Sequence, residues 1–177
     1  IALLERDHEG LEMGPRHDPL VASFMNGTVK GEDVFIPMES IIGGQPRCGF
    51  GWNMLMDCLA EGRAVSLPAS AVGAAQLSVN AVGAYARVRK QFRVPIATMG
   101  GVQEALSRIS STAFMLTASQ ALINSMLGQH EQPAVLSAAM KYQTTHRGRL
   151  VVNDAMDVLG GAGICRGPAN LMGNTYM

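Results

Sequence analysis

Two long runs of apolar and small residues at helical spacing constrain the fold of this chain more than any other feature. From about Gly51 onward such positions recur at alternating steps of four and three, which places them on one face of an α-helix. The first run is Leu67, Ala71, Ala74, Ser78, Ala81, Tyr85, Val88 and Phe92, and the second is Val102, Leu106, Ile109, Ala113, Leu116, Gln120, Ile123 and Leu127. Successive runs of this kind indicate antiparallel neighbours in an up-and-down bundle.

Prolines and glycines predict where these helices begin and end. Pro68 removes a backbone donor and crowds the carbonyl four residues earlier, so the first run predicts either one kinked helix or two helices. Gly128 is expected as the C′ residue of the second helix. A third helix is predicted to begin near Pro133 and to end at Gly160, and residues 167–174 predict the start of a fourth.

The first 44 residues have a different pattern. Short β-rich runs, among them residues 1–6 and 34–42, alternate with clusters of Gly, Pro, Asn and Asp, which is typical of strands and turns. We therefore expect 1–44 to be the last strands of a truncated β-domain and 45–177 to be an incomplete helical-bundle domain. The predicted fold class is mainly α, and the chain has the pattern of a piece of a longer one.

Charge and cysteine content exclude several function classes. Lys+Arg and Asp+Glu both number 14, so the formal net charge is zero, whereas a dedicated nucleic-acid binder needs a basic surplus. Charged residues make up only 16% of the chain against a usual value of about 25%, so we expect self-association to cover part of the surface. Cys48, Cys58 and Cys165 are widely spaced and have no companion histidine, which argues against disulfides and metal sites and favours the reducing cytoplasm.

Only residues 64–86 raise the question of a membrane span, because they carry no charge and are long enough to cross a bilayer as a helix. They consist largely of Ala, Gly and Ser and include Pro68, Gln76 and Asn80. This composition is too weakly apolar for good insertion. We interpret the stretch as a helix buried among other helices.

Arginine and lysine residues crowd the end of the first helical run, namely Arg87, Arg89, Lys90 and Arg93. One interpretation is compensation of the helix dipole, since cations in a last turn stabilise a helix by about 0.3 to 1 kcal/mol. The other is a clamp for phosphate or pyrophosphate, in which guanidinium groups hold the anion because the helix end presents carbonyls. Phe92 would then add a flat face for a planar ring.

Two further features are candidates for a site. Residues 159–163 form a glycine cluster that is either a helix stop or a turn that a ligand approaches closely, and it lacks the strand that a dinucleotide fingerprint requires. Glu61 and Arg63 lie in a mostly apolar run and are either an acid/base pair or an ion pair. The four histidines form no metal-ligand spacing, and no nucleophile elbow is present.

Four segments occur in a specific order: FIPMESIIGG, GWNMLMDCLAEGRAVSLPASAVGAA, AYARVRKQF followed by VPI, and DVLGGAGI. Together they resemble the acyl-CoA dehydrogenase family over essentially the whole chain, and most closely its long bacterial fatty-acid branch. The resemblance implies FAD-dependent α,β-dehydrogenation of fatty acyl-CoA to trans-2-enoyl-CoA in β-oxidation. A glutamate takes the α proton, FAD takes the β hydride, and an electron-transfer flavoprotein accepts the electrons.

The resemblance also assigns roles to particular residues. Arg89 would bind the FAD pyrophosphate of a neighbouring subunit in a homodimer or homotetramer, and 157–161 would approach the adenosine side of FAD. The turn 60–63 would line the substrate. The implied cofactor-binding residues are Arg89, Lys90, Gln91, Phe92, Asp157, Gly160 and Gly161, and the implied substrate-binding residues are Glu61 and Arg63.

Three positions depart from the family pattern. Arg93 replaces a usual Gly, while Asp157 and Gly100 each replace a usual Gln. Each change weakens a cofactor contact, and an acidic Asp157 beside a diphosphate is unfavourable unless it pairs with an arginine.

The catalytic base is expected beyond Met177. Some branches place it on the first bundle helix, but that position is Gly62 here, and Glu61 is one residue out of register. This fragment alone is therefore predicted to be inactive. The alternative from another class is a non-catalytic helical oligomerisation module that binds no flavin.

Overall fold

The computed structural model describes residues 1–19, 25–131, 133–165, 167–168, 170 and 172. The chain divides into two compact units, Ile1–Cys58 and Leu59–Tyr176, and the division falls within helix α1, Gly51–Ala64. The expected domain boundary between residues 44 and 45 stays a prediction.

The first unit contains a two-stranded antiparallel sheet. Strand β1, Leu11–Arg16, pairs with β2, Gly27–Gly31, and a bulge interrupts the register between Met13 and Arg16. Two short 3₁₀ helices follow, η2 at Met38–Ser40 and η3 at Gln45–Arg47.

Strands were expected at two further places in this unit, and there the prediction is wrong. Residues 1–6 make only a single antiparallel bridge, between Ala2 and Ile41. Residues 34–42 contain η2 in place of a strand. Pro37 precedes η2 and has no N–H to donate to a ladder, which favours the turn over a continuous strand.

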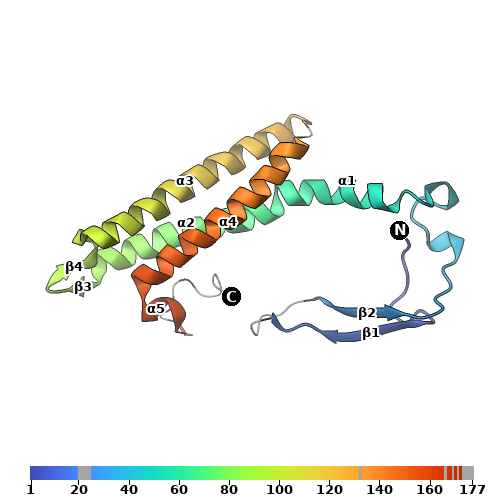
Figure 1. The fold of residues 1–177 in the computed structure, drawn as a ribbon, viewed down its shortest axis with the longest axis horizontal. Coiled ribbons are helices and arrows are strands. Elements are labelled where there is room, and N and C mark those ends of the chain that lie inside the picture. The colour runs from blue at the N-terminus through green and yellow to red at the C-terminus, as the bar shows by residue number, and fades with distance from the viewer. Residues whose placement is uncertain (20–24, 132, 166, 169, 171, 173–177) are drawn as a thin grey trace. The chain divides into compact units, whose positions relative to one another are not determined.

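Three long helices form the second unit and lie side by side: α2, Ser66–Val88; α3, Gly100–Gly128; and α4, Ala134–Leu159 (Figure 1). All three pack against one another, which confirms the predicted mainly helical, up-and-down fold. The connecting elements are β3, Lys90–Gln91; β4, Val94–Pro95; the 3₁₀ helix η4, Ile96–Thr98; and α5, Gly161–Ile164.

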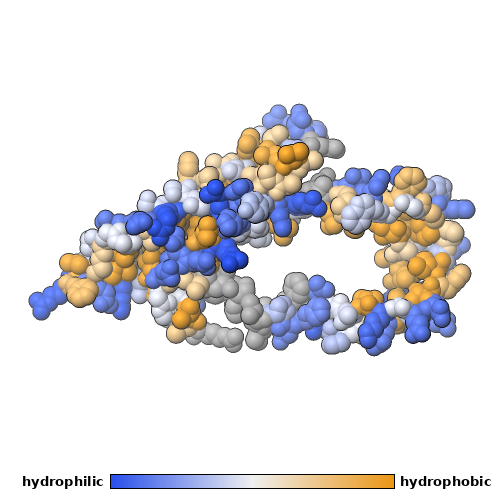
Figure 2. All heavy atoms as spheres, in the orientation of Figure 1, coloured by the Kyte–Doolittle hydropathy of each residue, from blue (hydrophilic) through white to orange (hydrophobic). Residues whose placement is uncertain are grey.

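The hydrophobic core of this unit lies between the three long helices. Its buried residues include Val72, Ala75 and Val82 of α2, Ile109, Ala113 and Leu116 of α3, and Val151, Ala155 and Leu159 of α4. A smaller cluster joins Ile123 of α3 to Met140 of α4. Figure 2 shows hydrophilic side chains mixed with hydrophobic ones over the visible surface of this unit.

The predicted core face is right for α3 and only partly right for α2. In α3 the buried positions are Ala105, Ile109, Ala113, Leu116, Gln120 and Ile123, which largely follow the predicted run. In α2, Ser78 and Ala81 are buried as expected, but Leu67 is 50% and Val88 is 79% exposed. The buried face is rotated toward Val72, Ala75, Val82 and Ala86. Small residues occur on every side of α2 itself, so few bulky side chains mark which face is buried.

The helix boundaries near Pro68 and Phe92 have different outcomes. Two helices meet before Pro68, as one of the two interpretations predicted, because α1 ends at Ala64 and α2 begins at Ser66. The expectation that Phe92 extends the helix is wrong. Arg89 ends α2 with extended backbone (φ −67°, ψ 124°), and the chain then turns in the β3–β4 hairpin.

The other predicted helix ends are mostly confirmed. Helix α4 starts after Pro133 and stops before Gly160, as expected. Gly128 does not serve as a left-handed C′ residue, because it is the last residue of α3 and His130 adopts the positive φ of 62°. Most of the predicted fourth helix, 167–174, lies outside the described residues; the described Gly167 and Pro168 are not helical.

Among the described residues, no helix combines the length and apolarity that crossing a bilayer requires.

Candidate functional site

A pocket of about 540 Å³ lies in the second unit, where the hairpin, the start of α3 and the end of α4 meet. Its wall combines polar side chains from the end of α2 and from β3 with aliphatic side chains and glycine backbone. The lining residues are Tyr85, Arg89, Gln91, Ile96, Val102, Val158, Leu159, Gly160, Gly161 and Ala162.

Backbone hydrogen bonds hold Arg89 at the junction between α2 and the hairpin. Its N–H donates to the Tyr85 carbonyl at 2.8 Å, and its carbonyl accepts from the N–H of Ile96 at 2.9 Å. Gln91 pairs with Val94 on the opposite strand. Side chains alternate across a strand, so Arg89 and Gln91 share one side. Both line the pocket, whereas Lys90 does not.

The hairpin tip consists of Phe92 and Arg93. Both have positive φ, 51° and 69°, as a two-residue loop of this type requires. Phe92 is 89% exposed, and neither residue lines the pocket. The structure therefore separates the four predicted cofactor residues of this segment into a pocket pair, Arg89 and Gln91, and an outward pair, Lys90 and Phe92.

The guanidinium of Arg89 is available to an anion. Among the described residues it has no hydrogen-bond or ion-pair partner, and the residue is exposed. No carboxylate is among the described residues that line the pocket. Arg87, in the last turn of α2, is also exposed but lies outside the pocket lining.

The glycine cluster forms the opposite wall. Gly160 follows α4 with φ 57°, a conformation that favours glycine, and its N–H donates to the Met156 carbonyl at 2.8 Å. A Cβ built on Gly160 or Gly161 would meet no heavy atom within 4 Å. The backbone here is thus uncovered, and a ligand can approach it closely.

Asp157, the third predicted cofactor position near the glycines, does not line the pocket. It follows Asp154 by three residues and so shares its helix face. Asp154 accepts two hydrogen bonds from Arg108, at 3.0 Å from Nε and 2.8 Å from Nη2. These bonds and the Asp154 charge raise the pKa of Arg108, and Glu104 and Asp157 add smaller effects of the same sign. Asp157 therefore acts on Arg108 on the surface of α3.

Of the two predicted substrate residues, the structure describes the side chain of Arg63. Arg63 is exposed in the last turn of α1 and does not line it. The side chain of Glu61 lies outside the described part of the structure. Gly100 is the first residue of α3 and is also absent from the lining.

Sequence reasoning did not identify Tyr85 as a site residue, nor the apolar wall of Ile96, Val102 and Val158. The only signal for Tyr85 was its position one helical turn before Arg89. The structure places no three His, Cys, Asp or Glu side chains together as a metal site in the residues that it describes.

Comparisons with known proteins agree with this fold. The family profile "Acyl-CoA dehydrogenase, C-terminal domain" matches residues 49–176. Protein HemX of Proteus mirabilis is 46% identical over 83 residues, which are 47% of this chain and 49% of that protein. The mitochondrial short-chain specific acyl-CoA dehydrogenase of Bos taurus is 29% identical over 159 residues, covering 87% of this chain and 37% of the relative.

A solved structure has the same fold. The acyl-CoA dehydrogenase from Geobacillus kaustophilus superposes with a TM-score of 0.81 at 17% identity, over 97% of this chain and 44% of that one. The chain thus spans less than half the length of these relatives.

Proposed function

Because this chain belongs to the acyl-CoA dehydrogenase family, we propose that it is the C-terminal part of an FAD-dependent oxidoreductase that converts fatty acyl-CoA to trans-2-enoyl-CoA. One observation carries the proposal. The pocket joins Arg89, at the end of α2, to Gly160 and Gly161, at the end of α4, and the family resemblance assigns both segments to FAD.

The residues of the pocket fit the diphosphate group of a nucleoside diphosphate or of a dinucleotide. Arg89 offers a guanidinium without a partner in the described part of the chain, and its planar fork suits two phosphate oxygens. Gln91 adds an amide donor. Gly160 and Gly161 leave space for close approach, and the aliphatic side chains give the ligand an apolar surface. When bound, FAD would supply the acceptor for the β hydride of the substrate.

In this proposal Arg89 neutralises the diphosphate and Gln91 orients it, which retains the cofactor but leaves the chemistry to other groups. Lys90 and Phe92 then flank the site from outside the pocket lining, whereas the charge of Asp157 acts on Arg108. The described pocket lining offers no carboxylate that could take the α proton, so we assign this pocket to cofactor binding alone.

The complete protein would act on fatty acyl-CoA in β-oxidation as a member of the long bacterial fatty-acid branch in the cytoplasm. It would pass electrons to an electron-transfer flavoprotein and assemble as a homodimer or homotetramer that completes each FAD site. Glu61 and Arg63 would lie near the substrate.

The test compares two arginines in the full-length protein that contains this chain. Arg89→Ala should weaken FAD binding by about 1.5 to 3 kcal/mol, the range for a hydrogen bond to a charged group. Arg87→Ala is the matched control, because Arg87 is two residues away, equally cationic and outside the pocket lining. The measurement is the dissociation constant of FAD for the apoprotein, from flavin fluorescence.

Two results would contradict the proposal. Equal losses at Arg89 and Arg87 would leave only a diffuse charge effect. A purified full-length protein without flavin absorbance, and without affinity for added FAD, would instead favour a helical oligomerisation module that binds no flavin.

A further inference from the structure

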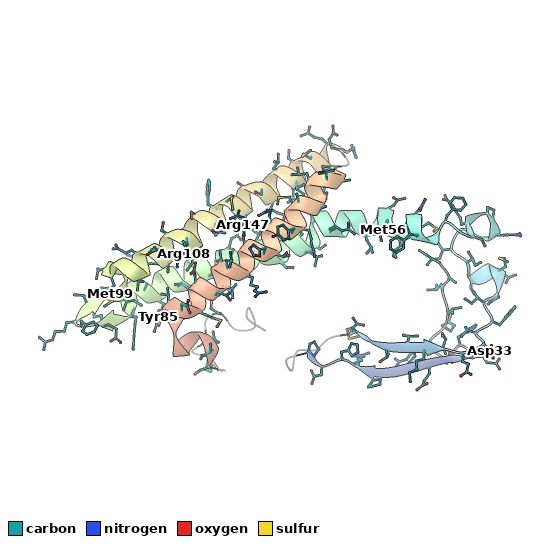
Figure 3. All side chains as sticks on the ribbon, viewed as in Figure 1. Asp33, Met56, Tyr85, Met99, Arg108 and Arg147 are labelled. Carbon is teal, nitrogen blue, oxygen red and sulfur yellow. The ribbon has the colours of Figure 1, made fainter. Side chains whose placement is uncertain are left out.

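Tyr85 lies in the last turn of α2, one turn before Arg89, and is labelled in Figure 3. Its ring is partly buried and packs against the hydrophobic core cluster. Its backbone carbonyl accepts the hydrogen bond that ends the helix at Arg89. The side chain is therefore anchored on one side by the core, and it also lines the pocket.

The hydroxyl of Tyr85 has no hydrogen-bond partner among the described residues. Of the described residues that line the pocket, three carry polar side chains, namely Tyr85, Arg89 and Gln91. Each of the three offers at least one hydrogen-bond donor. Because Tyr85 packs against the core and also lines the pocket, a ligand in the pocket can reach this side chain.

We infer that Tyr85 is a ligand-binding residue of this site and that its hydroxyl donates a hydrogen bond to the diphosphate held by Arg89. This inference rests on the proposed function, since it needs a phosphate-bearing ligand in the pocket. The ligand class is a nucleoside diphosphate, either free or as the diphosphate part of a dinucleotide.

Rigidity distinguishes the contribution of Tyr85 from that of Arg89. Arg89 is exposed and loses side-chain freedom when it binds an anion, whereas the Tyr85 ring is already ordered by the core. A hydroxyl on an ordered ring forms its hydrogen bond at low entropic cost. Tyr85 thus fixes where the phosphate sits, and Arg89 supplies the charge.

The experiment uses the full-length protein with Tyr85→Phe, which removes the hydroxyl and keeps the ring. FAD should bind about tenfold more weakly, as expected for loss of one hydrogen bond to a charged group. ADP should lose about the same factor as a competitor of FAD, while adenosine, which has no phosphate, should lose less than about twofold. Tyr142→Phe is the control, because Tyr142 is 61% exposed on α4 and lies outside the pocket lining.

The outcomes separate this inference from the proposed function. If Arg89→Ala weakens FAD binding and Tyr85→Phe does not, the role of Tyr85 is refuted and the FAD site stands. If neither substitution has an effect, the FAD site itself fails, and the inference with it. A loss for adenosine equal to that for ADP, or a fall in melting temperature of more than a few degrees in Tyr85→Phe, would also overturn the inference, because the hydroxyl would then serve the nucleoside or the fold.

Discussion

Replacing Gly148 by alanine should test how closely α2 and α4 approach each other. Gly148 is buried in α4, and a Cβ placed on it would lie 3.1 Å from the Cβ of Ala71 and 3.4 Å from its carbonyl oxygen. Carbon atoms prefer separations of about 3.5 to 4.0 Å. The added methyl therefore has to push the two helices apart.

The expected magnitude is a difference between two opposing effects. Alanine is favoured over glycine in a helix interior by about 0.8 to 1.0 kcal/mol. Adding a methyl to a filled contact costs about 1 to 3 kcal/mol. Gly148→Ala should thus lower the free energy of unfolding by about 0 to 2 kcal/mol.

Gly83 provides the matched control. It also lies inside a helix, α2, but a Cβ built there meets no heavy atom within 4 Å. Gly83→Ala should raise the free energy of unfolding by about 0.8 to 1.0 kcal/mol, because only the helix preference acts. The two variants should differ by about 2 kcal/mol, or by roughly 4 to 8 °C in melting temperature for a chain of this size.

The assay is urea unfolding followed by far-UV circular dichroism, with Ala71→Gly combined with Gly148→Ala as a third variant. This double variant moves the methyl from α2 to α4 and removes the close contact, so its stability should return to within about 0.5 kcal/mol of the parent. Equal stability changes in Gly148→Ala and Gly83→Ala would refute the close approach of α2 and α4.

Two further substitutions test strain and burial in the same unit. Arg93→Gly should raise the free energy of unfolding by up to about 1 kcal/mol, because Arg93 has φ 69° and glycine adopts this conformation without steric cost. Arg93→Ala is the control, because it keeps the strain and should give no gain in stability in the same urea titration. Gln120→Met should raise the free energy of unfolding by up to about 1 kcal/mol, because removing the buried Gln120 Oε1, which has no partner among the described residues, should outweigh losing the hydrogen bond from Gln120 Nε2 to Asn124 Oδ1. A loss of stability would contradict this order of effects. Exposed Gln143→Met is the control, because it also removes one side-chain hydrogen bond, to Arg147.

The contrast between α3 and α2 explains how far helix orientation could be predicted from sequence. In α3 the predicted run contains the bulky residues Ile109, Leu116 and Ile123, and all three are buried, although Phe114 and Leu122 are bulky and exposed. In α2, 16 of the 23 residues are Ala, Gly, Ser or Val, so few bulky side chains mark its buried face. The contact of Ala71 with Gly148 is long-range, and no local pattern encodes it.

The β3–β4 hairpin could not be predicted from the sequence for a related reason. A two-residue loop of this kind is usually marked by Asn-Gly or Asp-Gly, but here the loop is Phe92-Arg93. The turn depends on pairing of Lys90 with Pro95 and on burial of Ile96, which is 7% exposed. Tertiary packing thus overrides the weak local preference.

The sequence predicts the charged residue and the glycines of the candidate site. It does not predict the residues that only the packing of the helices brings to the pocket. Arg89 and Gly160 stand out in the sequence as a cation and a glycine at helix ends, and the structure places both in one pocket. Tyr85, Val102 and Val158 belong to regular helical runs, and nothing local shows that they line a cavity. They do so because three helix ends meet there.

Asp157 shows how the position of a residue around helix α4 affects the charge of the pocket lining. From its position next to the glycines, a carboxylate was expected to disfavour a diphosphate unless an arginine paired with it. Helical geometry places Asp157 on the face of Asp154, whose hydrogen bonds and charge raise the pKa of Arg108 together with a smaller effect of Asp157. The next two residues, Val158 and Leu159, line the pocket in its place, and Arg89 is the one charged side chain among the described residues of the lining. The proposed anion site therefore depends on the local separation of charges in a chain whose formal net charge is zero.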